Sequence, residues 1–160
     1  MRKFVFFIFL SVSCFAETDD SNVSTLRTAN VSAVVISSLE RVLQDEIDVN
    51  GQTKAEIFCA KNEYESFQII VANSSEKPVP NVNLKAGNWR FTGTPGEGSP
   101  VSTLYREHYV SIHKPSPRSK APKGLYPDAL IPFVNPYTGR IINDAKYRAA
   151  DCNIQPNKSQ

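Results

Sequence analysis

The stretch 55–72 constrains the fold of this chain more than any other, because two short apolar runs flank a polar break there. The runs, residues 57–60 and 67–72, are rich in apolar and β-branched residues. Short runs of this composition, bounded by polar residues suited to a turn, are typical of β-strands. The stretch therefore predicts two core strands joined by a turn.

Three further strands are predicted by the same criteria. Residues 31–36 form an apolar, β-branched run, and residues 103–113 are rich in aromatic and β-branched residues. Residues 79–86 alternate, which predicts a half-buried strand whose inner face carries Val82, Leu84 and Ala86. We expect Trp89 and Phe91, at strand spacing beyond it, to cover the core.

The segments between these strands are less regular. Asn50-Gly51 predicts a hairpin turn, because both residues tolerate positive φ. Residues 37–46 show helical spacing of Leu39, Val42 and Leu43 but lack a complete capping box, and they could also be an extended edge strand. Local propensity slightly favours a helical turn. The β-rich surroundings favour the extended form.

The last third of the chain contains fewer strand signals. Six of the eleven prolines fall within residues 115–136, which argues against a central strand or helix there and for a long excursion. Residues 141–142 are the one plausible strand beyond it, and residues 149–160 are polar with no closing hydrophobic strand. The count of five or six strands predicts an all-β, antiparallel sandwich of the immunoglobulin-like or jelly-roll type over residues 31–160.

A sandwich commonly needs seven or more strands, so we expect this one to be incomplete at its C-terminus. Missing strands would leave an unpaired sheet edge and uncovered core residues, among them Ile69, Ile70 and Val71.

The N-terminus predicts secretion. Residues 1–16 combine Arg2 and Lys3 with an apolar run and a small-residue cleavage site ending at Ala16, which is the pattern of a signal peptide. The run is too short to span a membrane. A lipoprotein signal with Cys14 lipidated is the weaker alternative to a secreted or periplasmic protein. Residues 17–30 are polar and aperiodic, which predicts a flexible lead-in.

Cleavage would also change the charge. The chain has 18 Lys+Arg and 16 Asp+Glu, and loss of the two basic residues of the signal leaves 16 of each. A neutral mature chain gives no electrostatic reason to expect a nucleic-acid or anionic-membrane partner.

No catalytic, cofactor-binding or metal-binding residue is predicted. Glu63 and Glu65 could form an acid pair, but a neutral turn lacks helper groups, so we interpret them as turn residues. His108 and His113 differ by five positions and would face opposite sides of a strand, which excludes a shared metal.

Several residues keep two interpretations. Cys59 and Cys152 could form a disulfide or remain separate thiols. A basic cluster in the proline-rich segment could attract an acidic glycan or another domain, although solvated loop charges are the commoner case; its members are Lys114, Arg118, Lys120 and Lys123. Three tyrosines could stack on sugar rings or pack within a sheet: Tyr105, Tyr109 and Tyr126. Asn-x-Ser sequons occur at Asn22, Asn30, Asn73 and Asn157. A chain rich in Asn, Ser and Thr contains some sequons by chance, so these four do not establish glycosylation.

Two motifs resemble one known family. Residues 60–68 (Ala-Lys-Asn-Glu-Tyr-Glu-Ser-Phe-Gln) are similar to the early signature of the β-sandwich domain that precedes the catalytic barrel in glycoside hydrolase family 123 and in proteins with the domain of unknown function 4091. Residues 105–110 (Tyr-Arg-Glu-His-Tyr-Val) and 124–132 (Gly-Leu-Tyr-Pro-Asp-Ala-Leu-Ile-Pro) resemble a strand and a loop of the same domain. The resemblance extends over about residues 31–160.

The resemblance implies a truncated, non-catalytic domain of a secreted glycosidase. Characterised family members are N-acetyl-β-galactosaminidases, whose adjacent Asp and Glu lie on a downstream (β/α) barrel, and no position here matches that pair. The partner would be the barrel of the same chain, with Asp128 and its surroundings as a contact surface. The alternative is a stand-alone β-sandwich module that binds glycans or another surface without enzymatic activity.

Overall fold

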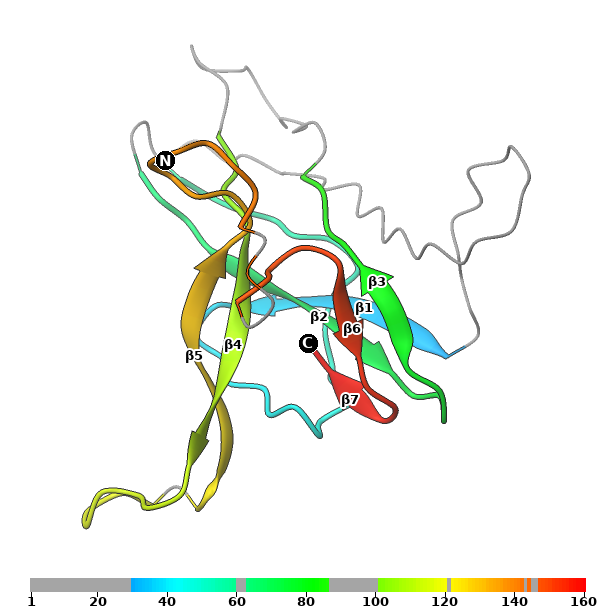
Figure 1. The fold of residues 1–160 in the computed structure, drawn as a ribbon, viewed down its shortest axis with the longest axis vertical. Helices are drawn as coiled ribbons and strands as arrows, with labels where there is room; N and C mark the ends of the chain where they lie inside the picture. The colour runs from blue at the N-terminus through cyan, green and yellow to red at the C-terminus, as the bar shows by residue number, and fades with distance from the viewer. Residues whose placement is uncertain (1–29, 60–62, 87–100, 121, 143, 145–146) are drawn as a thin grey trace.

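The computed structural model of the chain describes residues 30–59, 63–86, 101–120, 122–142, 144 and 147–160, and these form an all-β structure without a helix (Figure 1). The strands make three small antiparallel sheets, β1–β2–β7, β3–β6 and β4–β5, and a closed sandwich is not seen among them. The bounds are β1 Val31–Ser37, β2 Phe67–Asn73, β3 Val79–Val82, β4 Tyr105–Ile112, β5 Gly124–Pro132, β6 Cys152–Ile154 and β7 Lys158–Ser159. The predicted all-β, antiparallel class is confirmed; the signal peptide and most of the lead-in lie outside the described residues.

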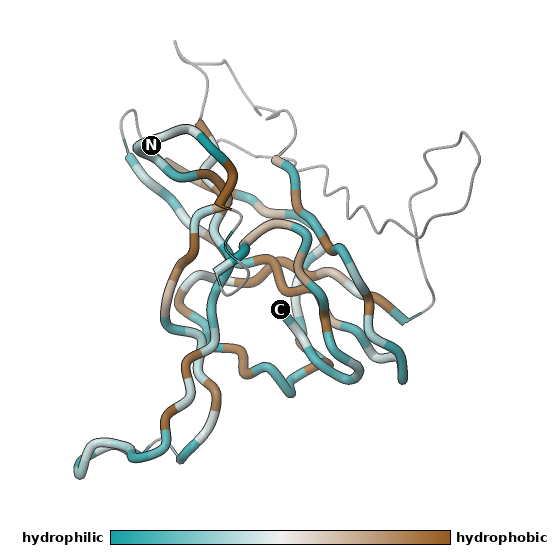
Figure 2. The backbone as a smooth tube through the Cα atoms, in the orientation of Figure 1, coloured by the Kyte–Doolittle hydropathy of each residue, from teal (hydrophilic) through white to brown (hydrophobic). Residues whose placement is uncertain are grey.

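Strand β2 is the centre of the core. It pairs with β1 along its whole length, from Ser37 opposite Phe67 to Val31 opposite Asn73. Its adjacent residues Ile70 and Val71 belong to two different hydrophobic clusters, because neighbouring side chains on a strand point to opposite faces. Figure 2 shows the hydrophobic residues of these strands gathered toward the middle of the molecule.

The two clusters explain why the run 67–72 is apolar without alternation. Ile70 packs with Ile36 and Val42, while Val71 packs with Val82 of β3 and Ile154 of β6. A strand buried on both faces needs apolar residues at consecutive positions. The expectation that Ile70 and Val71 would be uncovered is wrong: their exposed fractions are 4% and 2%.

The predicted hairpin at Asn50-Gly51 is wrong, and so is the predicted strand 57–60 over its described residues 57–59, which are irregular. Gly51 instead lies against β1, where Gln52 and Val35 exchange two backbone hydrogen bonds of 2.7 and 2.9 Å. A Cβ on Gly51 would lie 2.7 Å from the Cβ of Val34. Glycine is therefore needed here for close approach of two backbones and not for a turn.

Beyond Ser37, the last residue of β1, residues 38–46 form neither a helix nor a strand. Two turns organise them, closed by hydrogen bonds from the N–H of Glu40 to the carbonyl of Ser37 (3.2 Å) and from the N–H of Glu46 to the carbonyl of Leu43 (3.0 Å). Between the turns Val42 enters the first cluster, with 5% of its surface exposed. Neither the helix nor the edge strand expected from the sequence forms over residues 38–46.

The predicted strand 79–86 is shorter than expected. β3 ends at Val82, after Asn81 adopts a positive φ of 56° that breaks the register with β6. Val82 is buried and Leu84 half-buried as expected, but Ala86 is exposed. Trp89 and Phe91 lie outside the described residues.

The strand predicted over residues 103–113 is confirmed as β4. The strand predicted at residues 141–142 does not form, and Ile141 makes a single bridge to Val134 instead.

The proline-rich segment contains β5, which the sequence did not predict. β5 pairs with β4 from Pro132 opposite Tyr105 to Gly124 opposite Ile112. Among the described strands it has β4 as its one neighbour, so its prolines need not donate to a second strand. A bulge leaves Asp128 without a counterpart, since His108 faces Ala129 and Tyr109 faces Pro127.

The polar segment 149–160 also forms strands, which corrects the expectation that nothing closes the fold there. β6 pairs with β3 and places Ile154 in the core, and β7 pairs with the end of β2. Gln160 and Val71 exchange backbone hydrogen bonds of 2.8 and 2.9 Å, and the N–H of Ser159 donates to the carbonyl of Gln44. Asn157 supplies the turn between β6 and β7 with a φ of 51°, a conformation that asparagine tolerates.

The fully buried Asn73 connects these segments at the end of β2. Its Nδ2 group donates to the carbonyls of Lys77, Ile154 and Gln155 at 2.8, 3.3 and 3.2 Å. Its Oδ1 accepts from the N–H and the hydroxyl of Ser75 at 3.0 and 2.6 Å. The sequon at Asn73 is thus closed to glycosylation in the folded state, whereas Asn30 and Asn157 are exposed.

Replacing Gly51 by alanine should lower the free energy of unfolding by about 1–3 kcal/mol, because the new methyl group overlaps Val34 and the carbonyl of Val35. The matched control is Gly124→Ala, whose Cβ would find its nearest neighbour at 3.5 Å. Urea denaturation of both variants measures the difference. Equal stabilities would contradict the packing of Gly51 against β1.

Replacing Asn73 by alanine should cost about 2–4 kcal/mol, because it leaves buried carbonyls and the Ser75 N–H without partners. The control is Asn153→Ala, which removes a single exposed hydrogen bond to the N–H of Asn81 and should cost under about 1 kcal/mol. Chemical denaturation again provides the test. A cost at Asn73 as small as that at Asn153 would exclude the proposed network.

Candidate functional site

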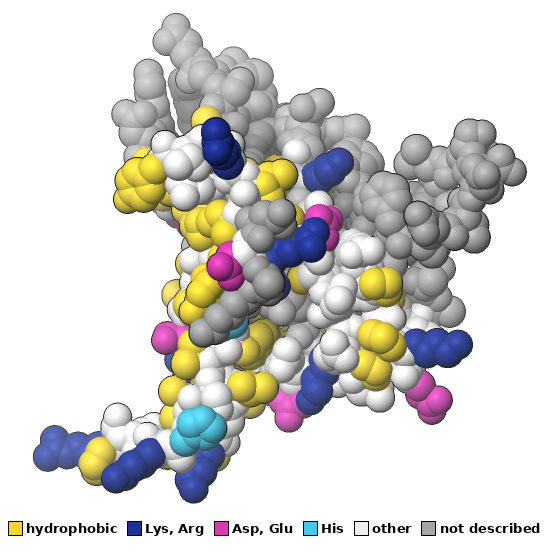
Figure 3. Space-filling view, in the orientation of Figure 1, with side chains coloured by type: hydrophobic (Ala, Val, Ile, Leu, Met, Phe, Trp, Pro, Cys, Tyr) yellow, Lys and Arg dark blue, Asp and Glu magenta, His cyan; other side chains and the backbone are white. Residues whose placement is uncertain are grey.

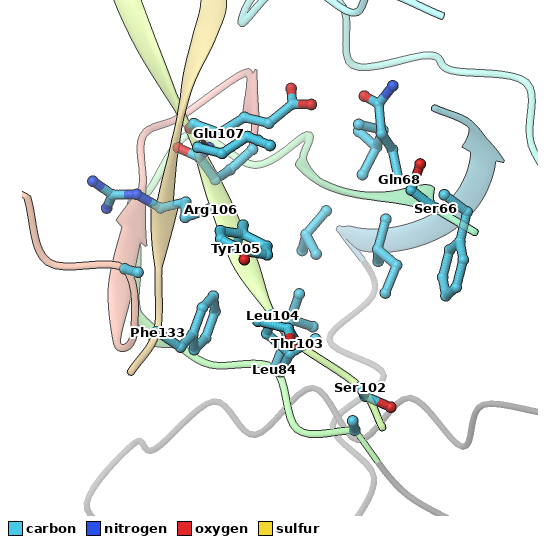
Figure 4. A pocket seen from close by; sticks show the side chains of 18 of the residues that line it. Ser66, Gln68, Leu84, Ser102, Thr103, Leu104, Tyr105, Arg106, Glu107 and Phe133 are labelled. Atoms are coloured by element: carbon cyan, nitrogen blue, oxygen red, sulfur yellow. Dashed lines mark hydrogen bonds between the residues drawn. The ribbon is translucent and has the colours of Figure 1, made fainter. Parts of the chain in front are cut away.

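A cavity of about 270 Å³ lies between β2 and β4 and is the candidate site (Figure 4). Apolar side chains make up most of its lining. Figure 4 shows Leu84, Leu104 and Phe133 at one end and Gln68 and Glu107 at the other. The cavity thus has an apolar end and a polar end, an arrangement that suits a largely hydrophobic occupant with few polar groups.

The polar end is supplied by one residue from each strand. The Nε2 group of Gln68 donates to the carbonyls of Ser37 and Glu40 at 3.0 and 2.7 Å, which anchors β2 to the first turn after β1. Its Oε1 atom is buried and has no partner among the described residues. Burial raises the pKa of the Glu107 carboxyl on β4, because the charged form loses hydration.

Behind this end, Arg106 lies beside Cys152. Burial raises the pKa of the Cys152 thiol, and the Arg106 guanidinium opposes that rise in part. A reactive cysteine needs a lowered pKa, so Cys152 has the environment of a packing residue. It packs against the cluster of Val71, Val82 and Ile154. Cys59 and Cys152 are free thiols in the structure, which decides between the two interpretations left open by the sequence.

The acidic and histidine residues considered from the sequence are dispersed. Glu63 and Glu65 are both exposed in the irregular segment before β2, although Glu65 reaches the cavity lining. His108 makes an edge contact with Tyr147 at 5.7 Å between ring centroids, while His113 is exposed beyond the end of β4. Within the described residues no three His, Cys, Asp or Glu side chains are grouped so that they could hold a metal ion.

The three tyrosines differ in their contacts. The hydroxyl of Tyr109 donates to the carbonyl of Val42, and burial raises its pKa to about 12. The hydroxyl of Tyr126 donates to the carbonyl of Pro122, and the Arg41 guanidinium lies 5.7 Å from its ring centroid. Tyr105 lines the cavity with half of its surface exposed. Of the three tyrosines, Tyr105 is the most exposed.

Sequence reasoning missed Gln68, Arg106 and Glu107 as cavity residues. Gln68 was visible as part of a motif, but its position beside β4 depends on the packing of strands far apart in the chain. Alternation along β4 places Glu107 with Tyr105, and no local signal indicates that this face meets β2.

The comparisons with known proteins add no family assignment. Neither a scan against protein-family models nor a search of curated proteins finds a match to this chain. No helix in the described part of the chain is long and apolar enough to cross a membrane.

Replacing Glu107 by glutamine should stabilise the protein at neutral pH. The pKa of Glu107 is higher in the folded state than in the unfolded state. Ionisation of Glu107 therefore lowers the stability as the pH rises from the unfolded-state pKa to the folded-state pKa, and the loss persists at all higher pH values. At pH 3 the carboxyl is protonated in both states, so the variant should gain nothing there. Glu76→Gln, in the exposed loop after β2, is the matched control.

Urea denaturation at both pH values measures this effect. A stability gain that is the same at pH 3 and pH 7, or that Glu76→Gln reproduces, would show that ionisation of Glu107 is not its cause.

Proposed function

We propose that the chain is a non-catalytic β-sandwich domain at the N-terminal side of a secreted, glycoside hydrolase 123-like protein. In this proposal the domain packs on the catalytic barrel of the same polypeptide, and the barrel hydrolyses O-glycosyl bonds as an N-acetyl-β-galactosaminidase or a related enzyme. The proposal draws on the quoted motifs. Two of them, residues 105–110 and 124–132, lie side by side as β4 and β5, which supports their belonging to one structural unit.

The observation that carries the proposal is an apolar hairpin that follows β5. Val134 bridges Ile141, and Asn135 closes the turn through hydrogen bonds from the N–H groups of Tyr137 and Thr138 to its Oδ1. Despite this order, the exposed fractions of Val134, Tyr137 and Ile141 are 46%, 95% and 67%. Exposed apolar side chains on a well-bonded hairpin are typical of a surface that another domain covers.

Neighbouring residues extend this surface. Leu130 of β5 is 58% exposed, and the register places it on the same face as Tyr105 of β4. Figure 3 shows hydrophobic side chains over the hairpin and down the β4–β5 ribbon. Asp128, exposed at the bulge, fits a contact with the barrel better than a catalytic role, since no second acid is paired with it across the ribbon.

A stand-alone glycan-binding module is the second candidate. The observation in its favour is the exposure of two tyrosine rings, Tyr64 at 99% and Tyr137 at 95%. Tyrosine combines a flat apolar face with a polar hydroxyl, which suits stacking on a sugar ring.

Association with the barrel tests the first candidate. The reading frame past the codon for Gln160 should encode a barrel with an adjacent Asp and Glu, and that barrel, expressed separately, should co-purify with this chain. The double variant Tyr137→Ala/Ile141→Asp should weaken the complex at least about tenfold, because it removes apolar area and buries a charge. Leu39→Asp, at a residue 94% exposed on a turn outside the ribbon, is the control.

The two candidates give opposite results. A stop codon after Gln160, together with glycan binding that Tyr137→Ala or Tyr64→Ala abolishes, would overturn the first and support the second. Hydrolysis of an aryl N-acetyl-β-galactosaminide by this chain without the barrel would overturn both.

A further inference from the structure

The β4–β5 ribbon projects beyond the rest of the described structure and ends in the loop 113–123 (Figure 1). The pairing continues to Ile112 opposite Gly124, so the loop is carried at the end of a ladder eight residues long on the β4 side. The described residues near the tip are mostly exposed. A turn closed by the N–H of Ser119 and the carbonyl of Ser116 orders the middle of the loop.

The tip concentrates positive charge. Four permanent cations lie in the loop or at its ends, Lys114, Arg118, Lys120 and Lys123, and all four are exposed. No acidic residue occurs between His108 and Pro127. Figure 3 shows dark blue Lys and Arg side chains at this end of the molecule, with no acidic side chain next to them on this face.

These cations are not neutralised by described carboxylates. The ion pair between described residues joins Arg148 and Asp151, in the segment before β6, and none of the four tip cations takes part in it. The predicted mature chain is formally neutral, so the tip is a local positive pole and not part of a general excess. Closely spaced like charges repel one another, and an anionic partner would relieve that repulsion.

We infer that this tip is a binding surface for an anionic polysaccharide, one that carries uronate or sulfate groups along a linear chain. Several exposed cations on a narrow ribbon match regularly spaced anions on a polymer. The loop has no Phe, Trp, Tyr, Leu, Ile or Val between residues 113 and 123. It therefore offers the single imidazole of His113 for stacking on bases and no large apolar side chain for insertion into a bilayer. These features favour a polysaccharide over a nucleic acid or a membrane.

Binding of the full chain to immobilised heparin and to polygalacturonate tests the inference, with neutral dextran as the reference polymer. We expect binding to both anionic polymers and none to dextran, with affinity falling about tenfold or more between about 50 and 250 mM NaCl because the contacts are exposed charges. The triple variant Lys114→Ala/Lys120→Ala/Lys123→Ala should lose at least about tenfold in affinity.

The matched control removes the same charge elsewhere. Lys77→Ala/Lys85→Ala/Arg140→Ala changes three exposed basic residues outside the tip and should retain binding within about threefold. Equal losses in the two triple variants, or no binding to either polymer at low salt, would overturn the inference. Tighter binding to duplex DNA or to phosphatidylserine vesicles than to the polysaccharides would also overturn it. The hairpin 134–141 lies at the other end of the ribbon. A negative result for polysaccharide binding at the tip therefore does not decide whether the hairpin associates with the barrel.

Discussion

The buried amide of Asn73 is the interaction on which the arrangement of the strands depends. A fully buried polar side chain is costly unless its hydrogen bonds are made, and Asn73 makes them to the loop after β2 and to the turn after β6. Because an amide both donates and accepts in fixed directions, it specifies which backbone groups may lie around it. An apolar residue of similar size would leave the carbonyls of Ile154 and Gln155 unpaired.

Segment 152–160 thereby becomes part of the core and not a tail. It supplies Ile154 to the cluster of Val71 and Val82, and the buried Ser159 donates through its hydroxyl to the carbonyl of Leu43. The Nε2 group of Gln160 donates to the carbonyl of Glu107. One short segment therefore ties β2, β3, β4 and the turns after β1 together, and it also forms part of the cavity wall.

Local sequence was informative where burial dictates composition and uninformative where backbone pairing dictates structure. The apolar runs of β1 and β2 predicted strands because their side chains enter the core. The aromatic and β-branched composition of β4 also predicted a strand, although its residues are half-buried or exposed. β5 was hidden by prolines that an edge position tolerates, and β6 and β7 were hidden because much of their stability comes from main-chain hydrogen bonds that any residue can make. Gly51 was predicted to form a turn, but a glycine is needed there because its backbone packs closely against β1. The cavity depends on β2 and β4 lying on either side of it, and the sequence of neither strand indicates that placement.

The surfaces and the core carry separate roles in this account. The core explains a stable scaffold, the hairpin after β5 offers the apolar surface, and the ribbon tip offers the basic one. All of them depend on segment 152–160 being docked, since it joins β2 to β4.

Amide hydrogen exchange at Ser159 and Gln160 is the most direct measurement of this claim. If the segment is docked, both amides exchange as slowly as the core amide of Val71, and all three accelerate together in denaturant. Exchange at Ser159 and Gln160 at the rate of an unstructured peptide, with Val71 still protected, would contradict it.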